Sequence, residues 1–384
     1  MPVEGVRRPA WAEIDASAIR HNVAAMQQLI GPIGICGVVK ANGYGHGAVV
    51  AARSFLDAGA VGLAVAIVDE GVELREGGIT EPILLLAETP PDTVRDALDA
   101  NLTLTVGSLD GARAAASSAA ELGGRHRVHV KIDTGMHRMG VSPADLDAVL
   151  DVLADSPHIV IEGLYTHFPV ADSMSTDDRN YSMQQVDEFH RLVDHAAARG
   201  IRPPLLHLAN SAASISLPSS RANMVRLGLV AYGYVPDSAM GVELAAHGIT
   251  LRPALSLKAR VTSVRHLSAG ERPSYGRRRP LATDATVATV PFGYADGYSR
   301  RLFDAGAEVL INGRRHPLAG SVTMDQLVID CDGAAVAVGD EVVLLGTQGS
   351  ESITADEWAT WADTISWEIL CGIGARVPRI TVSA

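Results

Sequence analysis

Short apolar runs recur along the first two-thirds of the chain, separated by longer segments of mixed polarity. Each run is rich in Val, Ile and Leu and apolar at most positions, a pattern typical of parallel strands that are buried on both faces. We count eight such runs, at residues 35–41, 61–66, 82–87, 102–106, 127–133, 161–168, 204–210 and 225–231. The pattern therefore predicts eight buried parallel strands.

Segments with helical periodicity lie between most of these runs, for example residues 48–59, 91–100, 144–155 and 183–200. Pro91 and the pair Ser142-Pro143 are expected helix starts, because proline fits the first turn of a helix. Only a short helical candidate joins the seventh and eighth runs. Eight strands that alternate with helices predict an α/β fold, with an N-terminal (β/α)8 TIM barrel.

After about residue 247 the pattern changes to strand-like runs separated by Gly, Pro and Asp, at residues 256–267, 285–293, 307–313, 326–333 and 340–346. One helical segment, residues 355–363, interrupts them. We expect a mainly β C-terminal domain. The predicted domains are 1–247, of which about the first 15 residues pack on the β domain, and 248–384.

The net charge of the 384-residue chain is −12, which disfavours nucleic acid and anionic membranes as partners. Three widely spaced cysteines, Cys36, Cys331 and Cys371, fit a reduced compartment and exclude a disulfide framework. Neither a signal peptide nor a membrane span is expected from the apolar runs. We expect a cytoplasmic protein.

Polar and basic residues collect where the predicted strands end. Strand ends meet at the C-terminal rim of a barrel, and this rim carries the reactive groups. The residues are Lys40 in run one, Lys131 and Arg138 at run five, His167 in run six, Asn210 and Ser211 at run seven, and Arg226 and Gly228 in run eight. The sequence therefore predicts a site at this rim.

Lys40 ends an apolar run and is followed by three glycines within seven residues. One interpretation is a lysine that packs its stem on apolar surface and extends its amine to water. The other is a nucleophile, because an amine desolvated beside cations such as Lys131, Arg138 and Arg226 has a lowered pKa and attacks aldehydes. The glycines would then let a ligand approach the backbone closely.

The segment VVKANGYGHG (38–47) resembles the cofactor-lysine motif of alanine racemases, which are fold-type III enzymes that use pyridoxal 5'-phosphate (PLP). Other segments resemble the family in the family's order: WAEIDASAIRHN (11–22), KIDTGMHRMG (131–140), GLYTHF (163–168), HLANS (207–211), MVRLGL (224–229), SYG (274–276), GYADG (293–297) and MDQ (324–326). The resemblance covers nearly the whole chain. It implies a PLP-binding barrel followed by a β domain, a homodimer whose active sites are shared between subunits, and interconversion of L- and D-alanine for peptidoglycan.

By the same resemblance, Lys40 bonds to the cofactor aldehyde and His167 stacks on the cofactor ring. Other implied cofactor contacts are Tyr44, Asn210, Ser211, Arg226, Gly228, Leu229 and Trp367, with Tyr44, Ser211 and the N–H groups of Gly228 and Leu229 on the phosphate. From the residues alone, Ser211 is also a candidate helix N-cap and His167 a candidate core histidine.

Arg226 resembles the arginine that faces the pyridine nitrogen of the cofactor. Because a guanidinium has no proton to give, it leaves the ring unprotonated and favours racemisation over decarboxylation. Racemisation needs a base on each face of the α-carbon; Lys40 matches one family base and Tyr275, contributed across the dimer interface, matches the other. We expect positive charge, for which Arg277 to Arg279 are candidates, to lower the high pKa of a tyrosine base.

For the substrate, the resemblance implies contacts from Arg138, the backbone of Met324, and Tyr294 at the entrance. Lys131 and Arg138 are neighbouring cations that would repel each other. Family members carbamylate the matching lysine, so we expect a carbamate on Lys131 that orients Arg138. Arg138 would then bind the substrate carboxylate.

One position departs from the family pattern. A tyrosine usually stands in a segment that ends YEI or YEV, and here the segment is ISWEIL, with Trp367. Indole keeps one N–H donor but is larger, so the phosphate contact and the width of the entrance are either altered or preserved by neutral packing.

Alternative substrates are serine or a broader set of amino acids. A protein of a different functional class, a non-catalytic PLP-binding barrel, is the other alternative.

Overall fold

The computed structural model describes residues 7–382. The described chain divides into two compact units. A barrel unit comprises residues 18–43 and 47–252, and a β unit comprises residues 7–17, 44–46 and 253–382.

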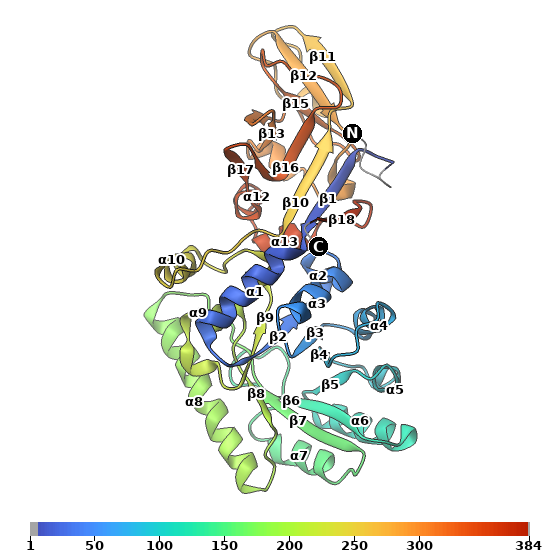
Figure 1. Ribbon diagram of the computed structural model, residues 1–384, viewed down its shortest axis with the longest axis vertical. Helices are drawn as coiled ribbons and strands as arrows, with labels where there is room; N and C mark the ends of the chain where they lie inside the picture. The colour runs from blue at the N-terminus through green and yellow to red at the C-terminus, as the bar shows by residue number, and fades with distance from the viewer. Residues whose placement is uncertain (1–6, 383–384) are drawn as a thin grey trace. The chain divides into compact units, whose positions relative to one another are not determined.

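Eight parallel strands form the sheet of the barrel unit, in the order β8-β7-β6-β5-β4-β3-β2-β9 (Figure 1). They are β2 Gly34–Val38, β3 Gly62–Val65, β4 Ile83–Glu88, β5 Thr103–Val106, β6 His126–Lys131, β7 Ile159–Tyr165, β8 Leu205–His207 and β9 Met224–Leu227. Each overlaps one of the eight predicted runs, so the predicted barrel is confirmed.

The two edge strands, β8 and β9, lie side by side without a regular ladder. Arg226 N donates to Ala209 O at 2.9 Å, and Leu206 N donates to the side chain of Asn223 at 2.7 Å. These bonds bring the last strand beside the seventh and nearly close the barrel. The residues at the ends of both strands consequently share one rim.

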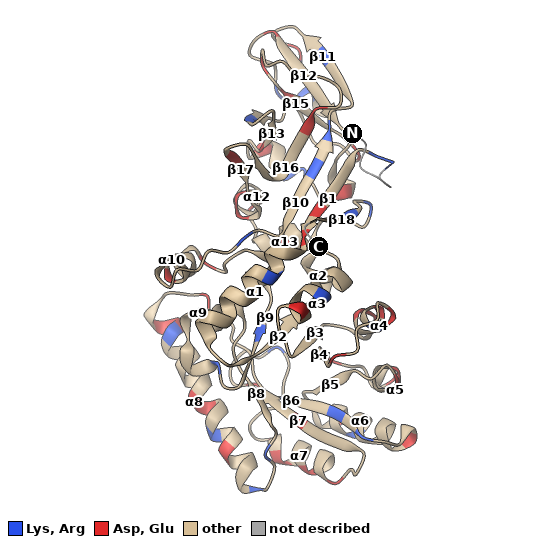
Figure 2. Cartoon of the chain, in the orientation of Figure 1, with Lys and Arg blue, Asp and Glu red and all other residues tan. Residues whose placement is uncertain are grey.

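The helices of the barrel unit follow the strands in alternation. They are α1 Ala16–Ile30, α3 Ala48–Asp57, α4 Val68–Glu76, α5 Val94–Asp99, α6 Leu109–Leu122, α7 Leu146–Ala154, α8 Thr176–Ala198, α9 Ser211–Ser216 and α10 Ser238–Ala246. Helices α5 and α7 begin three residues after Pro91 and Pro143, because a turn precedes each of them. Acidic and basic residues follow one another along α8 (Figure 2). Within the described residues, no helix is both long and apolar enough to cross a membrane.

The β unit contains a seven-stranded sheet with the path β14-β13-β16-β10-β1-β18, and β17 pairs with β16. Its strands are β1 Ala10–Asp15, β10 Leu255–Arg260, β13 Glu308–Ile311, β14 Arg314–Pro317, β16 Glu341–Gln348, β17 Glu351–Ile353 and β18 Arg379–Val382. Short helices, α11 Arg301–Asp304, α12 Ala355–Ala362 and α13 Ser366–Cys371, complete the unit. Strands β1, β14, β17 and β18 were not predicted from the sequence.

A second sheet of the β unit has the order β11-β12-β15, from Ser263–Leu267, Ala285–Val290 and Leu327–Asp330. The sequence predicted one run over residues 256–267, and this was wrong. The run breaks after Arg260, so that β10 pairs with β1 and β16 while β11 pairs with β12. One continuous apolar pattern thus serves two sheets.

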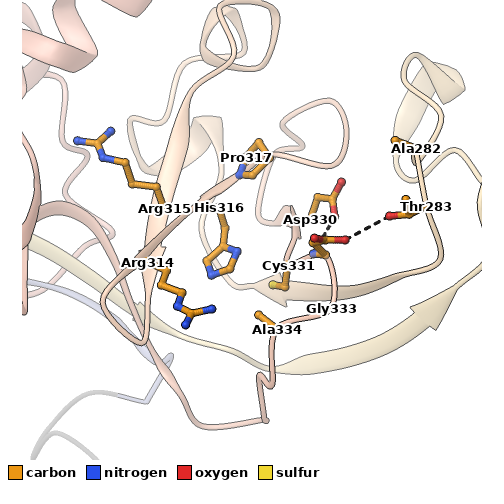
Figure 3. Close-up of a pocket in the computed structure, with 11 residues that line it drawn as sticks. Ala282, Thr283, Arg314, Arg315, His316, Pro317, Asp330, Cys331, Gly333 and Ala334 are labelled. Atoms are coloured by element: carbon orange, nitrogen blue, oxygen red, sulfur yellow. Dashed lines mark hydrogen bonds between the residues drawn. The ribbon is translucent and has the colours of Figure 1, made fainter.

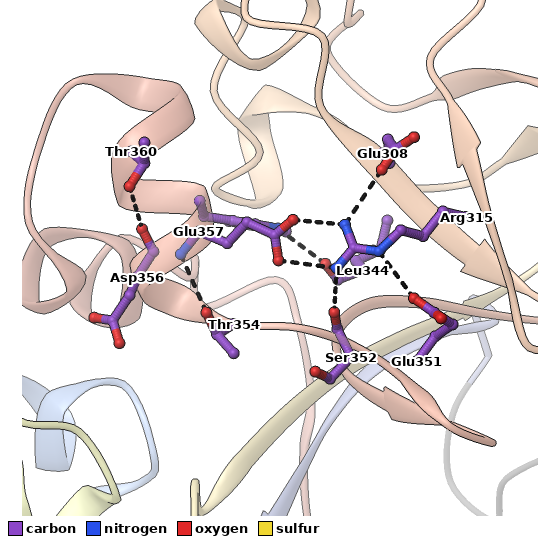
Figure 4. Close-up of polar contacts among 10 residues, drawn as sticks. Glu308, Arg315, Leu344, Glu351, Ser352, Thr354, Asp356, Glu357 and Thr360 are labelled. Carbon is purple, nitrogen blue, oxygen red and sulfur yellow. Dashed lines mark hydrogen bonds and ion pairs between the residues drawn. The ribbon is translucent and has the colours of Figure 1, made fainter. Parts of the chain in front are cut away.

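Arg315 on β14 links three elements of the β unit (Figure 4). Its guanidinium pairs with Glu308 at 3.2 Å, Glu351 at 3.1 Å and Glu357 at 2.5 Å, and also donates to the carbonyl of Ser352. These bonds raise the pKa of Arg315 further above its usual range, with the Glu357 bond the largest cause. The cation therefore fastens α12 and β17 to the β13-β14 hairpin.

Candidate active site

Lys40 lies two residues beyond β2, at the start of a left-handed turn. Ala41 (φ 52, ψ 51), Asn42 (φ 54, ψ 47) and Gly43 (φ 59, ψ 45) are all left-handed. Such a conformation costs about 1–2 kcal/mol for a non-glycine residue, so neighbouring contacts must hold it. Ala41 N donates to Glu70 Oε1 at 2.6 Å, and Ala48 N donates to Asn42 Oδ1 at 2.9 Å.

The glycines after Lys40 have a structural role in the turn, and the close approach of a ligand to their backbone stays a prediction. Gly43, Gly45 and Gly47 all have positive φ, at 59°, 81° and 98°. A Cβ on Gly43 would lie 2.9 Å from the Cβ of Ala51, and one on Gly45 would lie 2.1 Å from the carbonyl oxygen of Leu370. These glycines permit the turn and its packing against protein.

Arg226 is 3% exposed on β9, and protein acceptors hold the end of its guanidinium. Nη1 donates to His207 Nδ1 at 3.0 Å and to His207 O at 2.9 Å. Nη2 donates to the carbonyls of Thr166 and Leu208, at 2.9 and 3.0 Å, and lies 3.1 Å from His167 Nδ1. Of the three nitrogens, Nε alone has no acceptor among the described residues, so its N–H remains available to a ligand.

His167 follows β7 and is held neutral. Burial, followed by the charges of Arg226, Lys131, Arg138 and Lys40, keeps the pKa of His167 well below 6.5. A neutral ring accepts a hydrogen bond from Arg226 and presents an uncharged face to a ligand. The predicted stacking of His167 on a cofactor ring stays a prediction.

Lys131 ends β6, is 4% exposed, and lies among other cations. Burial, followed by the charges of Arg138 and Arg226, lowers its pKa from 10.5 to about 8, and Asp133 opposes the shift. Its Nζ lies 5.7 Å from the centre of the Tyr165 ring. Because Lys40, Arg138 and Arg226 all act on Lys131, these four residues form one cation cluster at the strand ends.

The loop that carries Arg138 is fixed by helix α8. Tyr181 Oη donates to the carbonyl of Gly135 at 2.9 Å, and Gln185 Nε2 donates to Thr134 Oγ1 at 3.2 Å. Gln185 Nε2 also donates to the carbonyl of His167 at 3.3 Å. One amide therefore joins the Arg138 loop to the end of β7.

The backbone after β9 meets the start of α9. Gly228 N donates to Ser211 Oγ at 2.9 Å, and Leu229 follows at the start of a 3-10 turn, Leu229–Tyr232. The helix cap is Asn210 rather than Ser211, because Asn210 Oδ1 accepts from Ala213 N at 3.0 Å. Asn210 as a cofactor contact stays a prediction, and Ser211 and Gly228 meet as an adjacent hydroxyl and amide.

The remaining predicted site residues belong to the β unit. Tyr275 is 74% exposed and begins a short 3-10 turn, Tyr275–Arg277. Ser274 Oγ donates to the carbonyl of Ser321 at 2.6 Å, which fixes the start of this turn. Arg278 pairs with Asp304, and Arg279 donates to the carbonyl of Leu318. Arg278 and Arg279 therefore bind groups other than Tyr275, whose pKa we expected them to lower.

Tyr294 and Met324 lie on two touching turns of the β unit. Tyr294 N donates to Thr323 O at 3.0 Å, and Ala295 N donates to Met324 O at 3.1 Å. Tyr294 is 41% exposed and Met324 is 52% exposed. Trp367, on α13, is partly buried.

Tyr44 is buried, and its burial raises the pKa of its phenol far above the usual value. Its predicted phosphate contact stays a prediction.

The β unit also contains a polar groove of about 600 Å³. Arg314 and His316 lie on one side of it, and Asp330 and Cys331 on the other (Figure 3). No predicted site residue lines this groove.

Sequence reasoning missed two buried histidines behind Arg226. His129 lies within β6 and His207 ends β8, and both are at most 3% exposed. A signal for both was present in the sequence, because each is a polar residue at an interior position of an apolar run. His129 lies within residues 127–133, and His207 lies within residues 204–210.

Two family descriptions match this chain: "Alanine racemase, N-terminal domain" over residues 14–236 and "Alanine racemase, C-terminal domain" over residues 254–381. An alanine racemase of Symbiobacterium thermophilum is 44% identical over 380 residues, which are 99% of this chain and 98% of that protein. The crystal structure of alanine racemase from Bacillus anthracis with bound L-Ala-P has a TM-score of 0.90 and 38% identity, over 98% of this chain and 96% of that one. A histidine racemase from Leuconostoc mesenteroides has a TM-score of 0.88 and 31% identity, over 98% and 99%.

Proposed function

The chain belongs to the alanine racemase family, and from that premise we propose that it interconverts L- and D-alanine with PLP, to supply D-alanine for peptidoglycan. The observation that carries the proposal is the cation cluster of Lys40, Lys131, Arg138 and Arg226 at the strand ends of the barrel. A phosphorylated cofactor and an amino-acid carboxylate are both anions, and such a cluster attracts them.

The residues present fit PLP. The Nε–H of Arg226 suits a ring nitrogen, and neutral His167 suits a ring face. Ser211 Oγ accepts from Gly228 N, so its own O–H can donate to a phosphate, and Lys40 would hold the aldehyde. When bound, PLP withdraws electrons from the substrate and makes its α-proton easier to remove.

Arg226 limits how far that electron withdrawal goes. A guanidinium donates a hydrogen bond but keeps its proton, so Arg226 would leave the ring nitrogen of bound PLP unprotonated. Arg226 would thereby favour removal and return of the α-proton over loss of the carboxylate. Arg226 therefore supports racemisation rather than decarboxylation.

Lys131 is proposed to carry a carbamate and Arg138 to bind the substrate carboxylate. The lowered pKa of Lys131, about 8, supports the carbamate, because carbon dioxide reacts with the neutral amine. An anion at Lys131 would accept hydrogen bonds from Arg138 and relieve the repulsion between the two cations.

Lys40 and Tyr275 are proposed as the two bases, one for each face of the α-carbon. Tyr275 is 74% exposed on a turn that Ser274 fixes, and this supports its contribution to the site of a second subunit. The proposal therefore includes a homodimer in which Tyr294 and Met324 also reach the partner's substrate. A cytoplasmic location completes it, supported by three widely spaced cysteines.

The similarity to a histidine racemase keeps another amino acid as a second candidate substrate. Trp367, where the family resemblance predicts a tyrosine, is the residue most suited to change the entrance. The test is a racemase assay with PLP on a panel of L-amino acids, with Lys40→Ala as the inactive control. Alanine as the fastest substrate supports the proposal. Racemisation of a larger amino acid with none of alanine, or activity that survives in Lys40→Ala, would contradict it.

A further inference from the structure

A chain of buried polar side chains leads away from Arg226 to the outside of β7. Arg226 Nη1 lies 3.0 Å from His207 Nδ1, His207 Nε2 lies 2.8 Å from His129 Nδ1, and His129 Nε2 lies 3.3 Å from Glu162 Oε2. His207 is 0% exposed and His129 is 3% exposed, whereas the side chain of Glu162 is 23% exposed. The chain thus joins a fully buried cation to a carboxylate that reaches solvent.

The direction of every hydrogen bond follows from Arg226. A guanidinium only donates, so His207 Nδ1 must accept and the His207 proton must lie on Nε2. His207 Nε2–H then donates to His129 Nδ1, which places the proton of His129 on Nε2, facing Glu162. A charged His129 would put two N–H groups against each other, so both rings must be neutral.

The surroundings fix the rings in these positions. The Tyr165 ring stacks on His207, with centroids 4.6 Å apart and planes inclined by 9°. A Cβ on Gly163 would lie 2.7 Å from His129, so the ring occupies space that only glycine leaves open. Burial is the largest cause that keeps the pKa of His207 well below 6.5, and the charge of Arg226 acts in the same direction. The hydrogen bond from His129 lowers the pKa of Glu162.

We propose that His207, His129 and Glu162 are positioning residues that hold Arg226 in place and set which of its N–H groups is left for a ligand. Within the described residues, no carboxylate lies within ion-pair distance of Arg226. Glu162 is the carboxylate to which Arg226 is connected, through the neutral imidazoles of His207 and His129. The hydrogen bond to His207 occupies Nη1, and carbonyl acceptors occupy Nη2, so Nε is left for the ligand. The consequence for PLP rests on the proposed function, but the hydrogen bonds from Arg226 to Glu162 do not.

The protonation of the two rings tests the proposal without cofactor or substrate. We expect ¹⁵N spectra of histidine-labelled protein to show both rings neutral and protonated on Nε2 at pH 7, with assignments from His129→Asn and His207→Asn. A ring protonated on Nδ1, or an imidazolium at either position, would overturn the proposal. Because this measurement uses unmodified apoprotein, it is independent of the racemase assay.

A variant at the far end tests the transmission to Arg226. Glu162→Gln removes the charge without touching His207, and Glu121→Gln is the matched control on an exposed carboxylate that pairs with Arg95. We expect Glu162→Gln, but not Glu121→Gln, to shift the His207 resonances and to weaken equilibrium binding of PLP about tenfold, which is about 1.4 kcal/mol. His207 resonances that stay unchanged in Glu162→Gln would overturn the positioning role, whether or not the protein racemises alanine.

Discussion

The lowered pKa of Lys131 makes carbamylation a quantitative prediction. Burial and the charges of Arg138 and Arg226 bring this pKa from 10.5 to about 8. At pH 7, about 9% of an amine with a pKa of 8 is neutral, against about 0.03% at a pKa of 10.5. The reactive form of Lys131 is therefore roughly 300-fold more abundant than that of an ordinary lysine.

The composition of the chain makes the measurement simple. It contains three lysines, Lys40, Lys131 and Lys258, so few amines compete for carbon dioxide. Lys258 pairs with Glu13 at 2.8 Å and is the matched control. In ¹³C spectra of protein incubated with ¹³C-bicarbonate, we expect a carbamate signal that persists in Lys258→Arg and disappears in Lys131→Arg, distinct from any signal of the α-amino group. Identical carbamate signals in Lys131→Arg and the native chain would refute the reasoning.

Three further predictions concern stability and the turn after Lys40. Gly45→Ala should lower the free energy of unfolding by about 1–3 kcal/mol from backbone strain alone, and by more than Gly31→Ala, because only the Gly45 Cβ would meet a carbonyl, at 2.1 Å; equal losses in urea unfolding would contradict the clash. Glu70→Ala removes the acceptor of Ala41 N and should cost about 1–3 kcal/mol and weaken PLP binding, which calorimetry and titration measure together. The pKa of Glu162 is lowered in the folded state, so Glu162 contributes stability that is present above its unfolded pKa and is lost as pH falls through the folded pKa. The difference in unfolding free energy between the native chain and Glu162→Gln should therefore shrink in acid. A difference that stays constant with pH would contradict this prediction.

The barrel could be predicted from the sequence because its strands are buried on both faces. Continuous apolar runs then mark each strand, and all eight runs correspond to observed strands. The β unit was harder, since an apolar run does not show where a chain leaves one sheet for another. The run over 256–267 divides between two sheets for this reason.

The cations of the site could be predicted because they stand at the ends of apolar runs, where the strands of a barrel carry its reactive groups. The contacts that hold these cations in place could not be predicted. The left-handed turn at Ala41 depends on Glu70, 29 residues away, and no local pattern indicates that contact. Likewise, Asn210 caps helix α9 while Ser211 accepts from Gly228 N, 17 residues away, and no local pattern indicates that contact.

The central claim is that two bases on opposite faces of the α-carbon exchange the proton of alanine. The most direct measurement is incorporation of deuterium from D2O at the α-carbon, starting from each pure enantiomer, in the native chain and in Tyr275→Phe. We expect the native chain to label and racemise both enantiomers, and the variant to lose exchange from one of them. Undiminished exchange from both enantiomers in Tyr275→Phe would contradict the account.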